Sequence, residues 1–287
     1  MTLGMLFREG KETLRKAGVG EWELDAWYLL EEVTGITRSR YYLDQECSVE
    51  EADEHRYREL LQKRSRHIPL QYLTGVQVFM GYSFLVDEQV LIPRQDTEIL
   101  VEEAVRHLRP GMEILDLCTG SGCILLSILK IIPGISGTGA DLSEGALRTA
   151  ERNRKNLGVH GAFVRSDLLE QVEGSFDAVL SNPPYIPSKE IDGLMEEVRE
   201  YEPRMALDGG TDGLYFYRKI IEQSPAYLKP DGMLFLEIGY NQAEAVQNLM
   251  EQGFTGIRVV KDLAGLDRVV YGRLKPQIDG GKKCLTD

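Results

Sequence analysis

Strand-like and helix-like runs of residues alternate from about residue 95 to near the end of the chain. The apolar run "MEILDLC" is typical of a strand, and "CILLSILKII" is typical of a helix that ends at Pro133-Gly134. Strands that alternate with helices predict an α/β fold, with a mostly parallel sheet covered on both faces. The last two strand-like runs have no helix between them, so we expect an antiparallel pair at one edge of the sheet. The predicted seven-stranded sheet consists of "MEILDLC", "GISGTGADL", "AFVRSD", "FDAVLSN", "GMLFLEIG", "TGIRVVKDL" and "DRVVYGRL".

The first 70 residues instead have the pattern of a helical domain. In "EWELDAWYLLEEV" the apolar residues recur at helical spacing, which predicts an amphipathic helix. "SVEEADEHRYRELLQKRSRH" contains no proline or glycine, and Ser48 and Glu51 near its start have the spacing of a capping box. "VQVFMGYSFLV" contains two β-rich runs around Met80-Gly81, which predicts a hairpin. We therefore expect a small helical N-terminal domain at 1–70, a β-hairpin linker at 71–92, an α/β domain at 93–276 and a disordered tail at 277–287.

The composition, with 43% hydrophobic and 28% charged residues among 287, is that of an ordinary soluble globular protein. No run approaches the roughly 18 apolar residues that a membrane helix needs, and the N-terminus lacks the apolar core of a signal peptide. The four cysteines have no CxxC spacing, so neither a zinc site nor a disulfide framework is expected. The four histidines show no ligand spacing either. We therefore expect a cytoplasmic protein without membrane association and without a metal site.

The net charge is −13, from 33 basic and 46 acidic residues. Proteins that bind nucleic acid through its phosphates usually carry a basic surface. The charge therefore argues against DNA or RNA as the main partner, although a local basic patch stays compatible with it. We interpret the acidic run "EEVREYE" (196–202) as a solvated helix face. Alternatively, it flanks a substrate channel and attracts a basic partner surface.

The first strand of the α/β region ends in the glycine-rich turn "DLCTGSG" (116–122). Gly120 and Gly122 allow the backbone to approach a ligand closely, because a side chain would collide there. A dinucleotide-binding turn would have a third glycine where this chain has Leu125, so binding of a pyrophosphate is disfavoured. Taken alone, the turn is equally compatible with an ordinary connection between a strand and a helix.

Acidic residues end the next two strands, where ligands of open α/β sheets bind. Asp141 follows the turn by about 20 residues, at a place where a carboxylate can accept hydrogen bonds from both hydroxyls of a ribose. Asp167 ends the third strand, near where an adenine would lie. Each acid alone is compatible with an ordinary strand end, but the combination indicates an adenosyl ligand. A ribose site without phosphate groups suggests S-adenosylmethionine, and an acidic pocket with Asp116 nearby suits its positively charged sulfonium.

The stretch "SNPPYI" (181–186) ends the fourth strand and should therefore lie beside the same pocket. Proline fixes φ at about −65° and donates no backbone hydrogen bond, so the two prolines hold the loop in a preset shape. The Asn182 side-chain oxygen and the Pro183 carbonyl can then accept the two hydrogens of a planar –NH2 group, while Tyr185 stacks on its plane. Such a nitrogen is a weak nucleophile because its lone pair is delocalised, so aiming it at a methyl carbon favours transfer. Asn182, Pro183 and Tyr185 are therefore the candidate catalytic residues.

The glycine-rich turn together with Asn-Pro-Pro-Tyr resembles methyltransferases that modify planar amino groups in nucleic acids or proteins. Four further stretches resemble the protein-(glutamine-N5) methyltransferases that act on peptide chain release factors: "LIPRQDTEILVE", "EYEPRMALDGGTDGLYFYRKI", "LEIGYNQAEAV" and "DLAGLDRVV". The similarity runs from about residue 5 to residue 275 and so covers nearly the whole chain. Asn-Pro-Pro-Tyr is shared with DNA-modifying enzymes, whereas E-P-x-x-A-L-x-G-G-x-D-G is much more specific.

The resemblance implies a Rossmann-like methyltransferase sheet, S-adenosyl-L-methionine as cofactor and a peptide chain release factor as partner. The implied reaction is methylation of the side-chain amide nitrogen (N5) of the glutamine in the partner's Gly-Gly-Gln loop. By the same resemblance, this glutamine is bound by Asn182, Pro183, Pro184 and Tyr185. The implied cofactor-binding residues are Cys118, Thr119, Gly120, Ser121, Gly122, Asp141, Leu168 and Asn182.

The chain departs from the family pattern at two positions. The family usually has glycine where Cys118 stands and proline where Gln95 stands. If that glycine has a positive φ, Cys118 is strained, and we expect the fold to tolerate it with modestly weaker cofactor binding. With Gln95 in this place, the chain lacks only a rigid proline at the start of a helix. Neither change removes a chemical group that the reaction needs.

Several alternatives stay open at this point. The glutamine can belong to a ribosomal protein, because a close relative with that substrate would share every catalytic residue. A nucleic-acid adenine N6-methyltransferase would need a basic groove and a sizeable recognition domain, which the charge and the short helical segment do not offer. A binding module with an inactive cofactor pocket would not explain the intact Asn-Pro-Pro-Tyr. We expect a monomer whose residues 1–70 recognise the partner, with capping of the catalytic domain as their alternative role.

Overall fold

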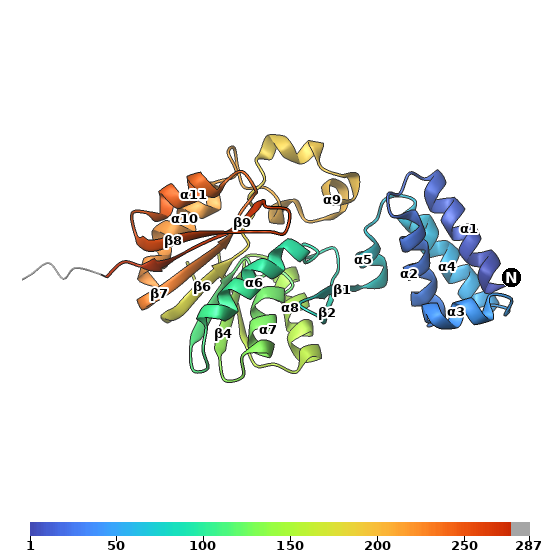
Figure 1. Ribbon diagram of the computed structural model, residues 1–287, viewed down its shortest axis with the longest axis horizontal. Helices are drawn as coiled ribbons and strands as arrows, with labels where there is room; N and C mark the ends of the chain where they lie inside the picture. The colour runs from blue at the N-terminus through green and yellow to red at the C-terminus, as the bar shows by residue number, and fades with distance from the viewer. Residues whose placement is uncertain (277–287) are drawn as a thin grey trace, which may run out of the picture.

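The computed structural model describes residues 1–276, and the predicted tail at 277–287 lies outside this range. Its N-terminal part is helical and packs around a core of its own, in which Leu6, Trp27 and Tyr57 are buried. In Figure 1 the bundle of the first four helices stands beside the α/β part and is joined to it through a fifth helix and a hairpin. The helices are α1 (Leu3–Lys16), α2 (Trp22–Thr34), α3 (Arg38–Asp44), α4 (Glu51–Arg64) and α5 (Leu70–Thr74).

The predicted capping box at Ser48 is wrong. Helix α4 begins at Glu51, with Glu50 at its N-cap and no side-chain hydrogen bond to the cap. Ser48 instead forms an isolated antiparallel bridge with Thr2, and the Val49 N–H donates to the Met1 carbonyl at 2.9 Å. This pairing with the start of the chain keeps residues 48–49 extended, so the helix cannot begin at Ser48.

The predicted hairpin is confirmed as β1 (Val76–Phe79) and β2 (Tyr82–Leu85), which pair antiparallel. Met80 and Gly81 form its turn with φ of 51° and 75°. Positive φ at both turn positions matches the right-handed twist of the paired strands. The hairpin is fixed to α8 (Glu144–Leu157), because the Leu85 N–H donates to Asn153 Oδ1 at 2.6 Å and Asn153 Nδ2 donates back to the Leu85 carbonyl.

The α/β part contains the predicted seven-stranded sheet, with strand order β5-β4-β3-β6-β7-β9-β8. Strand β9 runs antiparallel to both of its neighbours, whereas the pairs from β5 to β7 are parallel, so the predicted antiparallel pair at one edge is confirmed. The strands are β3 (Glu113–Leu117), β4 (Ser136–Asp141), β5 (Ala162–Arg165), β6 (Phe176–Ser181), β7 (Leu228–Glu237), β8 (Phe254–Lys261) and β9 (Asp267–Leu274). The remaining helices are α6 (Gln95–His107), α7 (Cys123–Ile131), α9 (Glu196–Tyr201), α10 (Tyr215–Gln223) and α11 (Ala243–Met250), with 3-10 turns η1 (Ser188–Gly193), η2 (Arg204–Ala206) and η3 (Ser224–Ala226).

Helices cover both faces of the sheet (Figure 1). Side chains alternate between the faces along each strand, so Phe235 packs with α6 and α7 while Leu234 and Leu236 pack with α10 and α11. Burial on both faces explains why the central strands read as continuous apolar runs. The parallel strands β3 to β6 all end at one edge of the sheet, and their following loops therefore meet there. None of the helices within residues 1–276 is long and apolar enough to cross a membrane.

Candidate active site

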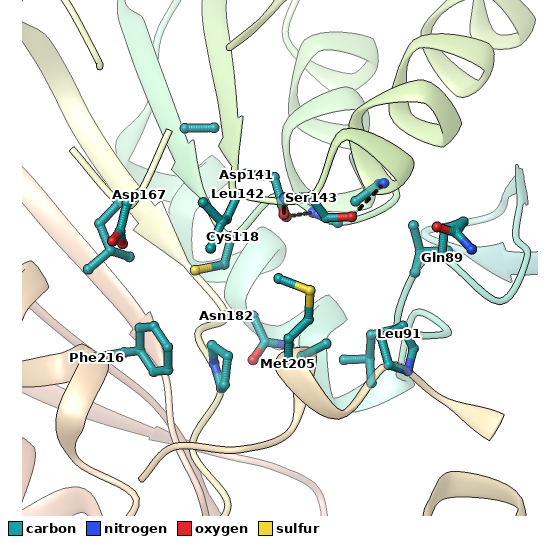
Figure 2. A pocket seen from close by; sticks show the side chains of 18 of the residues that line it. Gln89, Leu91, Cys118, Asp141, Leu142, Ser143, Asp167, Asn182, Met205 and Phe216 are labelled. Atoms are coloured by element: carbon teal, nitrogen blue, oxygen red, sulfur yellow. Dashed lines mark hydrogen bonds between the residues drawn. The ribbon is translucent and has the colours of Figure 1, made fainter. Parts of the chain in front are cut away.

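The loops that follow β3, β4, β5 and β6 enclose a cavity of about 250 Å³ at this edge of the sheet. Figure 2 shows Asn182 in the middle of the cavity lining, with Cys118 and Asp141 above it and Phe216 and Met205 nearby. Among the predicted site residues, those that line the cavity are Cys118, Gly120, Asp141, Leu168, Asn182 and Pro184. The structure thus brings together residues that lie up to 66 positions apart in the sequence, from 118 to 184.

The cavity wall combines apolar surface with acidic groups. Leu142, Leu168 and Phe216 supply apolar surface, while Asp141 and Asp167 supply carboxylates. The described residues of the wall include no lysine, arginine or histidine. Such a lining suits a ligand that is partly apolar and positively charged, and it disfavours phosphate groups because no cation faces them.

Asp141 joins the loops that follow β3 and β4. Its Oδ2 accepts a hydrogen bond from the Gly120 N–H and its Oδ1 accepts one from the Ser143 N–H, both at 2.9 Å. Burial raises the pKa of Asp141, and these backbone donors act against that shift by stabilising the charged form. Because each carboxylate oxygen can accept a second hydrogen bond, Asp141 can still accept from a ligand in the cavity.

Asp116 does not line the cavity, contrary to the expectation that its carboxylate lies close to the ligand. Its side chain is fully buried beneath the glycine-rich turn, and Oδ2 accepts a hydrogen bond from the Thr119 hydroxyl at 2.5 Å. Its Oδ1 has no hydrogen-bond partner among the residues that the structure describes. Burial raises the pKa of Asp116 to about 7. Asp116 therefore shapes the turn from below.

Three predicted cofactor-binding residues belong to the turn without lining the cavity. Thr119 and Ser121 are buried, and Gly122 has φ of 79° at the start of α7. A Cβ on Gly122 would lie 3.0 Å from Leu126 Cδ1, so glycine permits close packing of the turn on its own helix. A direct contact of these residues with the cofactor stays a prediction.

Cys118 has φ of 57°, the left-handed conformation on which its expected strain depends. A residue with a Cβ in this conformation costs roughly 1–2 kcal/mol. Its side chain forms part of the cavity wall (Figure 2). Burial raises the pKa of the Cys118 thiol, so the sulfur stays protonated and adds no charge to the cavity.

Asn182 and Pro184 line the cavity, whereas Tyr185 borders a second depression together with Pro187 and Tyr240. The Asn182 amide is anchored on the side of α6, where Nδ2 donates to the Thr97 hydroxyl at 3.2 Å. Burial raises the pKa of the Tyr185 hydroxyl, which therefore stays neutral. The Asn-Pro-Pro-Tyr loop thus forms the partition between the cavity and the second depression.

Two segments hold this loop in place, and the sequence did not reveal their role. The Ile186 N–H donates to the Leu207 carbonyl at 3.0 Å, and the Gly209 N–H donates to the Ile186 carbonyl at 2.8 Å. A Cβ on Gly209 would lie 2.7 Å from Tyr185 Cα, so only glycine fits at this contact. From the other side, Gln242 Nε2 donates to the Tyr185 carbonyl at 3.0 Å. Both segments lie in stretches that resemble the release factor methyltransferases, "MALDGGTDG" and "LEIGYNQ". This resemblance was the sign in the sequence that the two segments belong to the site.

Comparison with known proteins identifies the family. Residues 5–75 match the family described as "PrmC N-terminal domain", and residues 95–200 match "Methyltransferase small domain". A protein of Geobacter sulfurreducens named "Release factor glutamine methyltransferase" is 40% identical over 263 residues, covering 91% of this chain and 93% of the relative. The chain belongs to the release factor glutamine methyltransferase family. A relative of the same name from Caulobacter vibrioides is 39% identical, covering 96% of this chain and 98% of the relative.

The fold of this family member is shared with more distant methyltransferases. A solved methyltransferase structure from Pyrococcus furiosus superimposes with a TM-score of 0.54 at 17% sequence identity. The superposition covers 74% of this chain and 98% of that chain. The predicted Rossmann-like methyltransferase sheet is therefore confirmed.

In this family member, the acidic run at 196–202 is only partly a solvated helix face. Glu202 is 5% exposed, forms an ion pair with Arg94 and accepts a hydrogen bond from the Ile92 N–H. Glu197 pairs with Arg64 of the N-terminal helices at 2.8 Å. The interpretation as a solvated face is therefore wrong for Glu202, because its pairing with Arg94 anchors the segment that continues to Pro203 and Met205 in the cavity wall.

Proposed function

We propose that this protein transfers a methyl group from S-adenosyl-L-methionine to the side-chain amide nitrogen (N5) of the glutamine in the Gly-Gly-Gln loop of peptide chain release factors. The observation that carries the proposal is a rigid Asn-Pro-Pro-Tyr loop that forms one wall of an acidic cavity, whose described lining contains no basic residue. Relatives that are about 40% identical over nearly their whole length bear the name of this activity. A cytoplasmic location belongs to the same proposal, because the proposed substrate is part of the translation machinery.

The cavity residues fit the cofactor by their chemistry. Asp141 would accept hydrogen bonds from the ribose hydroxyls, and Leu168 and Asp167 would border the adenine. Cys118 and Gly120 would contact the cofactor through the turn, with Thr119, Ser121 and Gly122 as its supporting residues. The acidic lining without basic groups suits a sulfonium cation. When bound, S-adenosylmethionine supplies an activated methyl group.

The residues of the loop act on the glutamine amide. Asn182 Oδ1 and the Pro183 carbonyl accept its two N–H hydrogens, and the Pro184 and Tyr185 side chains bound the amide plane. An amide nitrogen is a poor nucleophile because its lone pair is delocalised into the carbonyl. Fixing both hydrogens directs the nitrogen at the methyl carbon, and orientation of this kind is worth at most about 7–11 kcal/mol. No base is needed beforehand, since the methylated amide cation is acidic and loses its proton readily.

The Asp141→Ala variant is expected to bind S-adenosylmethionine more weakly by about 1–3 kcal/mol, or about 5- to 150-fold in Kd. The change removes the carboxylate proposed to hold the ribose and also releases the two backbone N–H groups that it accepts from. Isothermal titration calorimetry measures the Kd. Glu144→Ala is the matched control, because it removes an exposed acid three residues away that does not line the cavity. Equal Kd values for Asp141→Ala and Glu144→Ala in folded proteins would remove Asp141 from the binding site.

Methyl transfer can be measured directly with radiolabelled S-adenosylmethionine. The purified protein is incubated separately with a release factor, with ribosomes and with DNA. We expect label in the release factor, located by mass spectrometry on the glutamine of its Gly-Gly-Gln loop. A release factor with that glutamine replaced by alanine is the control and should stay unlabelled. Preferential label in ribosomal protein would favour the alternative glutamine substrate, and preferential label in DNA would contradict glutamine as the target.

A further inference from the structure

Two buried residues lie behind Asn182, on the side away from the cavity. Thr97 belongs to the first turn of α6 and is 2% exposed, and Glu237 ends β7 and is also 2% exposed. Neither residue lines the cavity. Thr97 accepts a hydrogen bond from Asn182 Nδ2 at 3.2 Å, and the Thr97 hydroxyl lies close enough to the Glu237 carboxyl to favour its charged form. The Oε2 atom of this carboxyl has no hydrogen-bond partner among residues 1–276.

The orientation of the Asn182 amide determines what it offers to a substrate. An asparagine side chain carries a donor –NH2 at one end and an acceptor oxygen at the other, and the two ends are nearly the same in shape. Rotation of the amide by a half turn would exchange them. In the observed orientation Nδ2 is engaged by Thr97, so Oδ1 is the end available to accept the N–H of a glutamine amide. In the flipped orientation two donors would face each other and the substrate amide would be repelled.

Thr97 alone does not define this orientation, because a hydroxyl both donates and accepts. A threonine whose hydrogen is not committed can donate to Asn182 Oδ1 just as well as it can accept from Nδ2. In its ionised form Glu237 removes this ambiguity, since a carboxylate only accepts and therefore takes the Thr97 hydrogen. Thr97 is then left as an acceptor for Asn182.

Burial raises the pKa of Glu237 to about 7, so its charged form predominates above neutral pH. Asp96 lies on the same helix as Thr97 and is paired with Arg268 at 2.9 Å. Arg94 and Arg268 favour the charged form of Glu237, whereas Asp96 and burial oppose it. A buried carboxylate is costly, and its cost is best explained by a role that an apolar residue cannot fill.

We propose that Thr97 and Glu237 are positioning residues that fix the amide orientation of Asn182 and so present Oδ1 to the substrate glutamine. This inference rests on the proposed function. Neither residue touches the substrate. They act through Asn182 alone, so their removal should affect kcat and leave cofactor binding nearly unchanged.

Thr97→Val and Thr97→Ser test the inference as a matched pair. Valine keeps the shape of threonine without the hydroxyl, and serine keeps the hydroxyl. We expect Thr97→Val to lower kcat for release factor methylation on the order of 10- to 100-fold, because a misoriented amide disturbs the alignment of the substrate. Thr97→Ser should stay within about threefold of wild type, and both variants should bind S-adenosylmethionine with wild-type Kd. Thr97→Ala replaces Thr97→Val if the latter does not fold.

Glu237→Leu and the double variant Thr97→Val/Glu237→Leu complete a double-mutant cycle. If the two residues act in series, Glu237→Leu also lowers kcat, and the double variant loses no more than the worse single variant. A kcat for Thr97→Val equal to that of Thr97→Ser would overturn the inference, as would multiplicative losses in the double variant. If the wild-type protein methylates no release factor, the proposed function fails. If it does and the valine variant is as active as wild type, only the inference fails.

Discussion

Replacing Asn182 with alanine is expected to lower kcat for release factor methylation on the order of 1,000-fold or more. The change removes the acceptor proposed to hold one N–H of the substrate amide, so the nitrogen is no longer aimed at the methyl group. The fold should survive, because the loop is held by backbone hydrogen bonds from Ile186 and Gly209 and by Gln242. S-adenosylmethionine binding should weaken by less than about tenfold, since the other cavity residues stay in place.

Single-turnover kinetics with saturating cofactor separates the chemical step from binding for this variant. Asn156→Ala is a suitable control, because Asn156 is an exposed asparagine on α8 that donates to the Ser83 carbonyl of the hairpin and does not line the cavity. It should leave kcat unchanged. Near-wild-type turnover by a folded Asn182→Ala variant would show that the loop does not orient the amide in the way proposed.

The sheet was predictable from sequence because its signals are local. The central strands β3, β6 and β7 contain apolar runs bounded by turns, and burial on both faces requires such runs. The position of the cavity followed from one geometric rule, that parallel strands carry their following loops to the same edge. Asp141, Gly120 and Asn182 therefore came together without any information on long-range contacts.

The parts that were not predictable depend on contacts between distant segments. Ser48 has the local signature of a helix cap, but its pairing with Thr2 overrides it. Glu202 lies in an acidic run, and only the fold shows that Arg94, 108 residues earlier, pairs with it. Asp116 lies at the end of its strand, where a cavity residue was expected, but its side chain does not line the cavity. Alternate side chains of a strand point to opposite faces of a sheet, and that of Asp116 points away from the ligand side.

The role of Gln242 could not be inferred for a similar reason. Its side chain reaches the Tyr185 carbonyl, 57 residues away in the sequence. A polar residue near a strand end gives no indication of which backbone group it will satisfy. The sequence can therefore locate a site at strand ends more readily than it can identify the residues that support the site.

The N-terminal helices allow a second prediction with a large effect. The residues that line the cavity begin at Gln89, so none of them belongs to residues 1–70. The helices have a hydrophobic core of their own. They contact the α/β part through the Arg64–Glu197 ion pair and through the Tyr201 hydroxyl, which donates to the Arg66 carbonyl at 2.6 Å. We propose that this helical unit binds the release factor outside its Gly-Gly-Gln loop.

Specific protein interfaces bury on the order of 1,200–2,000 Å² in total, and a single loop supplies only a fraction of that area. Deleting residues 1–70 is therefore expected to lower kcat/KM for a full-length release factor on the order of 100-fold, equivalent to about 3 kcal/mol. A short peptide that contains Gly-Gly-Gln never reaches the helices, so its kcat/KM should fall by less than about threefold. Calorimetry should find S-adenosylmethionine binding largely intact, which also shows that the truncated protein is folded.

The full-length Glu197→Gln variant provides the control for the lost contact between the two parts. It breaks the ion pair with Arg64 and keeps the helical surface, so its kcat/KM for the release factor should stay well above that of the truncated protein. The comparison of protein with peptide then decides the role of the helices. Equal losses for both substrates in a truncated protein that still binds the cofactor would mean that residues 1–70 only cap the catalytic part, because a recognition surface cannot affect a substrate that does not touch it.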